Sequence, residues 1–429
     1  MKKNLLDKVI GYYFVVLVIV LNLMGLLSTY DVFYSDFISN TLICFGILAL
    51  ILYVIYRIKN KITRKWDLII ILMAFLDYLS YYYAFDRKVA LKGFLLGREG
   101  LFVIYTYYVI FLLSSVLKDK GVKEKIILVF TICGALQVMY GLFQVLGISN
   151  IFGISIIGNW KYASGFVFNS NFFGTYMVLL NGFWMSKFFL AEDVNYKYIL
   201  ILLMFMVGIL ISGAMSAIVA LVFIFFILIL HILLGRRINT KKLIKKIGMY
   251  LVSLVLIYSV ITLWTKSDLT KDIGELCNQS VSTISGNIDE TFGTGRIYIW
   301  KEAMKYFPDY IYTGIGIDNF AYIGHKDGTY IYDSFNRDNV IYKAHNEYLQ
   351  ILVTEGIFKF AIYILFLGTI FFVTLKNFKL IKKKDIVFSL FLAFLGYLVQ
   401  AFFNISMTLI APIFYIISGI LISFVEFNN

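Results

Sequence analysis

Two polar stretches carry side chains that could do chemistry, and both lie beside long apolar runs. The first begins at Gly295 and Arg296, and the second is His345 and Asn346, directly ahead of an apolar segment. Arginine stays charged and its planar fork can hold two phosphate oxygens. A neutral histidine can accept a proton from a hydroxyl. These residues suit the stabilisation of a leaving phosphate and the activation of a hydroxyl, although on spacing alone polar side chains at a membrane interface fit as well.

The arginine is placed by a predicted amphipathic helix. One face of this helix would carry Ile297, Trp300, Ala303, Met304 and Phe307. Pro308 should end it, and the turn Gly314-Ile315-Gly316 follows. The free N–H groups at the start of a helix favour anions, which suits a phosphate beside Arg296.

Composition assigns the chain to the membrane proteins. Of its 429 residues, 60% are hydrophobic, and the mean hydropathy is +0.83. The net charge of +13 comes from short clusters between apolar runs, which is typical of topology signals and not of nucleic-acid binding. No spacing of Cys, His or paired carboxylates predicts a metal site, so no metal and no cofactor is expected.

About 12 apolar segments are long enough to cross a bilayer, which needs roughly 20 residues. The predicted fold is an all-α polytopic membrane protein, with residues 1–429 forming a single integral membrane domain and the first span uncleaved. The predicted spans are 8–28, 38–56, 66–85, 100–117, 126–146, 172–190, 198–212, 215–234, 247–265, 348–375, 386–404 and 407–426.

Charge predicts the orientation of these spans. Basic clusters fall on alternate connections, as cytoplasmic loops require, so both termini should be cytoplasmic. The connection 266–347 is then a large extracytoplasmic loop containing short helices. A loop of about eighty residues is usually functional. Its first part, Ser267 to Gly293, is polar and predicted to be irregular.

Two further outer connections hold candidate ligands. The connection from Asp86 to Glu99 carries four basic residues against two acids, which suggests an anionic ligand or contact with lipid phosphates. We expect Arg98 to face the interior. In the next outer connection, Lys161 is the cation, and Asn169 and Asn171 could bind sugar hydroxyls or cap the following helix.

Three patterns in the chain resemble the O-antigen ligase and O-antigen polymerase superfamily. They are Gly295-Arg296 with its aromatic helix, His345-Asn346 followed by nine residues and Gly356, and Gly165-x-x-x-Asn169-x-Asn171. The resemblance implies a metal-independent glycosyltransferase that uses a polyprenyl-pyrophosphate-linked donor. Arg296 would stabilise the leaving pyrophosphate and His345 would act as the general base.

The resemblance also suggests sugar contacts around this pair. Trp300, Asn346 and Tyr348 could stack on sugar rings or bind hydroxyls. Glu355 is a carboxylate inside a predicted span, where it could contact substrate, pair with an outer-loop cation or pair with Arg296.

Three positions depart from the family pattern. Tyr162 and Met215 stand where relatives often have arginine, so Lys161, Arg98 or Arg87 could supply the missing cation. Lys359 stands where ligases usually show a small residue or tyrosine, which favours a polymerase.

The predicted function is therefore polymerisation of repeat units linked to undecaprenyl pyrophosphate, in the bacterial cytoplasmic membrane and on its extracytoplasmic face. The partners would be these lipid-linked oligosaccharides, with a chain-length regulator and a flippase as further candidates and no nucleic acid. The alternative is a ligase that transfers the finished glycan to lipid A core or a protein. A lipid-oligosaccharide flippase is a third hypothesis, disfavoured because ionisable residues are scarce inside the spans.

Overall fold

The structure is a computed structural model in which all predicted spans form helices. It describes residues 3–27, 32–61, 64–94, 97–148, 150–151, 154–156, 161–235, 239–264, 274, 292–324, 340–377 and 385–427. The predicted irregular segment from Ser267 to Gly293 lies outside the described residues, apart from 274, 292 and 293.

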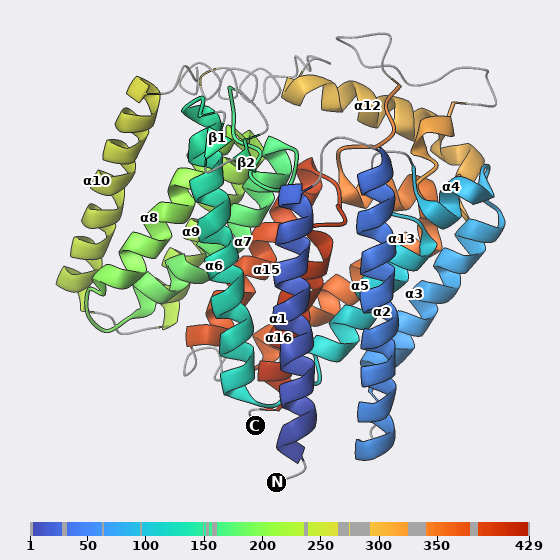
Figure 1. Ribbon diagram of the computed structural model, residues 1–429, viewed down its shortest axis with the longest axis horizontal. Coiled ribbons are helices and arrows are strands. Elements are labelled where there is room, and N and C mark those ends of the chain that lie inside the picture. The colour runs from blue at the N-terminus through green and yellow to red at the C-terminus, as the bar shows by residue number, and fades with distance from the viewer. Residues whose placement is uncertain are drawn as a thin grey trace.

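The helices that occupy the predicted spans stand side by side as a bundle (Figure 1). They are α1 (Lys3–Leu27), α2 (Val32–Asn60), α3 (Lys65–Tyr82), α5 (Leu101–Ser114), α6 (Lys120–Val145), α7 (Ser170–Leu190), α8 (Tyr196–Ser212), α9 (Met215–Gly235), α10 (Thr240–Trp264), α13 (Glu347–Lys376), α15 (Asp385–Phe403) and α16 (Ala411–Glu426).

Length and hydropathy support a membrane-spanning bundle. In the described part of the chain, seven helices are long and apolar enough to cross a membrane, namely α1, α2, α6, α9, α10, α13 and α15. Three shorter apolar helices, α5, α8 and α16, accompany them. The all-α polytopic fold is confirmed. A small addition is an antiparallel pair of two-residue strands, β1 (Asn150–Ile151) and β2 (Ile154–Ser155), between α6 and α7.

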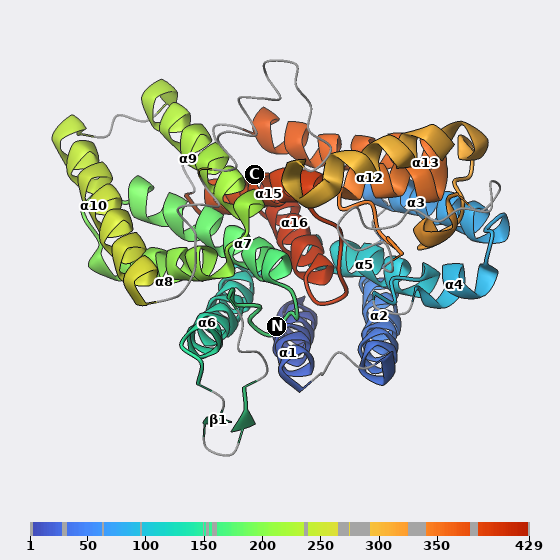
Figure 2. The same cartoon turned by 90° about the horizontal axis from the view of Figure 1, so that it is seen from above.

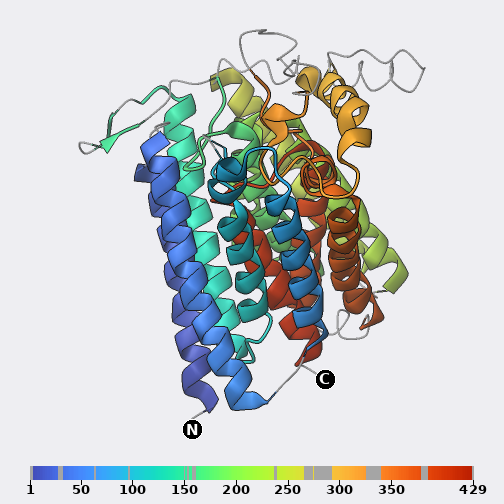
Figure 3. The same cartoon turned by 90° about the vertical axis from the view of Figure 1, so that its right-hand side faces the viewer.

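Both chain ends lie at one end of the bundle, and the short helices of the large loop lie at the other (Figures 1 and 3). The short elements at this far end are α12 (Phe292–Tyr306), the 3-10 turns η1 (Phe307–Tyr310) and η2 (Phe320–Tyr322), and α4 (Arg87–Lys92). We call this end the loop end. Seen from above it, α12 runs over α13 (Figure 2), and the two helices are in contact.

The apolar face of α12 differs in part from the predicted one. Ile299, Ala303 and Tyr306 are buried in a small core with Ile315, Phe320 and Val353 of the neighbouring turns and α13. Met304, predicted on this face, is 46% exposed. The face is shifted because residues spaced by three and four around Ile299 point at α13, which turns Met304 away. The helix ends at Tyr306, close to the predicted stop, and Pro308 lies in the first turn of η1.

A break in α13 receives the glycine-rich turn. Gly356 has φ 85° and ψ 172°, so the helix is interrupted there. The carbonyl oxygens of Val353 and Thr354 accept hydrogen bonds from the backbone N–H groups of Ile315 and Gly316, at 3.1 and 2.9 Å. A Cβ on Gly356 would lie 2.3 Å from the oxygen of Tyr312. The close approach of these two segments of the chain therefore requires glycine. This gives a structural reason for the last residue of the His-Asn-x9-Gly pattern.

Candidate active site

The residues just before α13 are held by the ion pairs of Lys343. Its ammonium lies 3.2 Å from Glu99 Oε2 and 2.5 Å from Asp318 Oδ1, and the side chain is 5% exposed. Burial by itself would lower the pKa of Lys343, but the nearby carboxylates of Asp318 and Glu99 outweigh this and raise that pKa above its usual value. Lys343 is therefore a buried cation between two acids.

The following residue, Ala344, is held by hydrogen bonds on both sides of its backbone. Its carbonyl oxygen accepts from Trp300 Nε1 at 3.0 Å, and its N–H donates to Gln350 Oε1 at 2.7 Å. Trp300 belongs to α12, so this bond ties the outer helix to the start of α13. Asn346 is the N-cap of α13, and its side chain accepts from the N–H of Leu349 at 3.0 Å.

His345 is exposed between these two buried neighbours. Its φ is 51°, in the left-handed region that residues with a Cβ rarely occupy. Ala344 and Asn346 are buried on either side. A strained backbone is kept only where the surroundings hold it, and such residues gather at functional sites. The fold thus presents this imidazole at the loop end.

Arg296 lies one helical turn before Trp300 on the same face of α12. Gly295, with φ 80°, interrupts the helix just before it. Side chains four residues apart on a helix lie next to each other, and Trp300 is bonded to Ala344. The part of α12 that carries Arg296 and Trp300 is thereby joined to the residue before His345. The sequence, in which Arg296 and His345 are far apart, supplied only their types.

The guanidinium of Arg296 is mostly buried. Among the described residues its Nε is a buried donor without a hydrogen-bond partner. Burial lowers the pKa of Arg296 from its usual value, yet arginine stays protonated in proteins. A buried cation with an unused donor is costly unless an anion accompanies it, so this residue is suited to a phosphate ligand.

Arg98 pairs with an acid of α2 and is next to Glu99 in the sequence. Its Nε lies 2.9 Å from Asp36 Oδ1, and the side chain is 14% exposed. The adjacent Glu99 binds Lys343, so Arg98 lies close to the segment that ends in His345. The Arg98 side chain is mostly buried, but Asp36, its partner, is 48% exposed, and the predicted role of Arg98 in ligand binding stays a prediction.

The loop end of α15 contacts α12 and α13, and the residue after it binds α7. The Phe402 ring meets Trp300 edge to face at 5.5 Å, and the Leu398 oxygen accepts from Tyr348 Oη at 2.8 Å. Asn404 Nδ2 donates to Thr175 Oγ1 of α7 at 3.1 Å. Tyr348 and Asn346 thus use polar atoms within the protein, and their predicted sugar contacts remain predictions.

Residues 199–364 match the model of a protein family described as O-antigen ligase. The superfamily resemblance is confirmed. No curated protein matches the chain. The match implies a glycosyltransferase-like membrane enzyme, and it includes Arg296, Trp300, His345 and Gly356. The residues predicted on the earlier outer connections, Arg98 among them, lie before the matched O-antigen ligase segment.

Tyr162 contacts the turn before Met215, the other position described above as departing from the resemblance. A Cβ on Gly213 would meet the Tyr162 ring at 2.2 Å, and Ala163 donates from its N–H to the Ile211 oxygen at 2.8 Å. Tyr162 therefore packs on the turn that leads into Met215. Lys161 is exposed here, with its ammonium 5.2 Å from the centre of the Tyr162 ring. Of the three cations suggested by the sequence, Lys161 is thus placed at this turn.

Asn169 and Asn171 stand at the start of α7, close to the same turn. Asn169 is the N-cap and accepts from the N–H of Asn171 at 2.8 Å, so capping accounts for its Oδ1. The Asn171 backbone oxygen accepts from the Thr175 hydroxyl, which in turn accepts from Asn404 Nδ2, just after the end of α15. Asn404 follows the helix end that carries Phe402, which contacts Trp300, and the sugar contacts predicted for both asparagines stay predictions.

Glu355 belongs to an ion cluster inside the bundle. Its Oε2 lies 2.8 Å from Lys359 Nζ of the same helix. Lys359 also pairs with Asp77 of α3 and donates to Tyr108 Oη at 2.7 Å. The cation of Glu355 is therefore Lys359, and neither Arg296 nor an outer-loop residue as the sequence suggested. The i,i+4 spacing of Glu355 and Lys359 could have revealed this pair.

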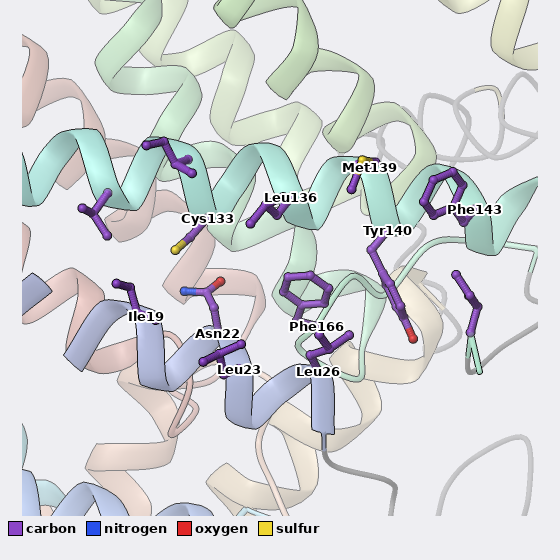
Figure 4. Close-up of a pocket in the computed structure, with 13 residues that line it drawn as sticks. Ile19, Asn22, Leu23, Leu26, Cys133, Leu136, Met139, Tyr140, Phe143 and Phe166 are labelled. Carbon is purple, nitrogen blue, oxygen red and sulfur yellow. The ribbon is translucent and has the colours of Figure 1, made fainter. Parts of the chain in front are cut away.

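The remaining features are the metal-ligating residue types and an apolar groove. Within the described ranges, no three His, Cys, Asp or Glu side chains gather as metal ligands. A groove of about 670 Å³ lies between α1 and α6 (Figure 4) and is lined almost wholly by apolar side chains. None of the predicted site residues lines it. The sequence interpretation missed Lys343, Glu99 and Asp318, because scattered single charges carry no pattern.

Proposed function

We propose that this protein polymerises lipid-linked oligosaccharide repeat units. The donor is a growing glycan on undecaprenyl pyrophosphate, and the acceptor is a hydroxyl on the next lipid-linked unit. The observation that supports the proposal is the hydrogen bond from Trp300 to Ala344, which joins the helix that carries Arg296 to the residue before the exposed His345.

The roles follow from the chemistry of the transfer. The acceptor hydroxyl gives its proton to a ring nitrogen of His345 as its oxygen forms the new bond to the anomeric carbon. The bond from that carbon to the pyrophosphate oxygen breaks, and its electron pair leaves with the lipid pyrophosphate. Arg296 binds the charge that develops there. Lys161 is the proposed second cation, because it stands at the turn where Tyr162 and Met215 replace arginines.

The orientation in the membrane is part of the proposal. Both termini lie opposite α12, and the basic connections predicted to be cytoplasmic precede α3, α6 and α10 at the terminal end (Figure 1). The site then faces the extracytoplasmic side of a bacterial cytoplasmic membrane. A flippase would deliver the lipid-linked units to this side, and a chain-length regulator would act on the product.

The test uses purified protein in detergent with a synthetic repeat unit on undecaprenyl pyrophosphate. Wild type, His345→Ala, Arg296→Ala and Met304→Ala are compared by the ladder of products on a gel. Met304 is the control because it lies on α12 but is exposed. We expect a ladder for wild type and Met304→Ala, and the single unit for both site variants.

Two results would redirect the function. If the wild type makes no ladder but transfers the glycan to added lipid A core or a peptide, the protein is a ligase. If it transfers to no acceptor, yet moves lipid-linked units across a vesicle membrane, it is a flippase. An unchanged ladder in His345→Ala would remove the proposed base.

A further inference from the structure

The left-handed backbone of His345 needs a restraint on each side. On its C-terminal side the restraint is the capped start of α13, since Asn346 binds the N–H of Leu349. On its N-terminal side, the chain is held by the backbone bonds of Ala344 and by the side chain of Lys343. A residue with a Cβ leaves this conformation when its surroundings relax.

Lys343 connects three separate parts of the structure. Glu99 stands just before α5 and also accepts hydrogen bonds from Tyr107 Oη at 2.8 Å and Ser406 Oγ at 2.9 Å. Asp318 stands in the turn before η2, and its Oδ2 accepts from the N–H of Phe94 at 2.6 Å. Both carboxylates are thus fixed before Lys343 reaches them. Lys343 is therefore bound to two fixed carboxylates, and this restrains the backbone of the residues that follow it, Ala344 and His345.

We propose that Lys343 is a positioning residue that holds His345 in its exposed, left-handed conformation. The role of the imidazole as a base rests on the proposed function, but the restraint on its backbone does not. Lys343 is 4% exposed and both its partners are buried, so a substrate at the surface does not reach its ammonium. It acts by fixing the main chain two residues before the base.

The test compares Lys343→Met with Lys359→Met. Lys359 is a matched control, because it is also buried and also pairs with two carboxylates, Asp77 and Glu355. Amide hydrogen exchange is followed on the peptide covering residues 340–349, in protein reconstituted in lipid nanodiscs. The rate of repeat-unit transfer is measured on the same samples and divided by the folded fraction.

We expect Lys343→Met to speed exchange in this peptide at least tenfold and to lower kcat by at least tenfold, with KM changed less than threefold. Lys359→Met should leave exchange of residues 340–349 within twofold of wild type. Lys343→Arg keeps the charge and should recover part of both losses. In Lys343→Met the carboxylates of Glu99 and Asp318 lose their cation. Adding Glu99→Gln and Asp318→Asn removes these two buried charges, so the triple variant should regain thermal stability but not kcat.

Unchanged exchange in Lys343→Met would overturn the proposal, and so would recovery of full kcat in the charge-free triple variant. Equal exchange in the Lys343 and Lys359 variants would also overturn it, because the effect would then be general loosening. A wild type without glycosyl transfer refutes the proposed function alone. The exchange comparison then still decides whether Lys343 holds the chain at His345.

Discussion

The hydrogen bond between Trp300 and Ala344 can be removed almost in isolation. In Trp300→Phe the ring is shortened but can still pack on Phe402, while the donor to the Ala344 oxygen is lost. Ala344 is fully buried, so its carbonyl is left without this partner. Leaving a buried acceptor unsatisfied costs about 1–3 kcal/mol. We expect the segment before His345 to loosen by this amount.

The kinetic consequence follows from that free energy. If the correct placement of the base is lost to the same extent, kcat falls by about 5- to 150-fold, since each 1.36 kcal/mol corresponds to a factor of ten. KM should change little, because the bond holds the base and does not touch the substrate. The assay is the initial rate of ladder formation over a range of lipid-linked substrate concentrations.

Trp184→Phe is the matched control for this experiment. Trp184 Nε1 donates to Thr131 Oγ1 at 3.1 Å, within the bundle between α7 and α6. Its loss should lower stability by a similar amount and leave kcat per folded molecule within twofold. The reasoning would be refuted by a Trp300→Phe variant with wild-type kcat, or by equal losses of kcat in both tryptophan variants.

Three further predictions concern other residues of the site and its support. Arg296→Lys keeps a charge but loses the planar fork, so kcat should fall at least about tenfold in the ladder assay; full activity would show that charge alone suffices. Gly356→Ala forces a Cβ against Tyr312 and should cost about 1–3 kcal/mol in thermal unfolding, whereas Gly368→Ala, whose Cβ would meet only the Phe372 ring at 4.0 Å, should cost less than about 0.5 kcal/mol. Tyr348→Phe should lower stability by about 1 kcal/mol with unchanged KM, and a raised KM would instead support the sugar contact predicted from the sequence.

The membrane-spanning helices could be read directly from the sequence. Runs of about 20 apolar residues have few alternatives to helix, because a bilayer leaves backbone groups without water to bind. The boundaries of α1, α9 and α13 therefore fall within a few residues of the predicted spans. The same local rules gave the helix end near Pro308. Asn346, in contrast, was predicted as a sugar contact, and the structure shows that it caps α13.

The contacts of individual polar residues could not be read in the same way. Met304 is exposed although the helical pattern counted it as apolar, because the direction of α13 selects which face of α12 is buried. Glu355 pairs with Lys359 and not with an outer-loop cation, because the bundle encloses both in its interior. Such choices depend on how elements pack, which no single stretch of sequence contains.

By itself the sequence determined the class of protein, the helices and the residue types of the site. Arg296, His345 and Gly356 were recognisable because each belongs to a short pattern. Only the tertiary structure decided that Trp300 of α12 binds the residue before the histidine, and that Lys343 is buried between Glu99 and Asp318. The physical reason is range: helix formation is governed by neighbours within a few residues, whereas an ion pair between distant residues exists only after the whole bundle has closed around it.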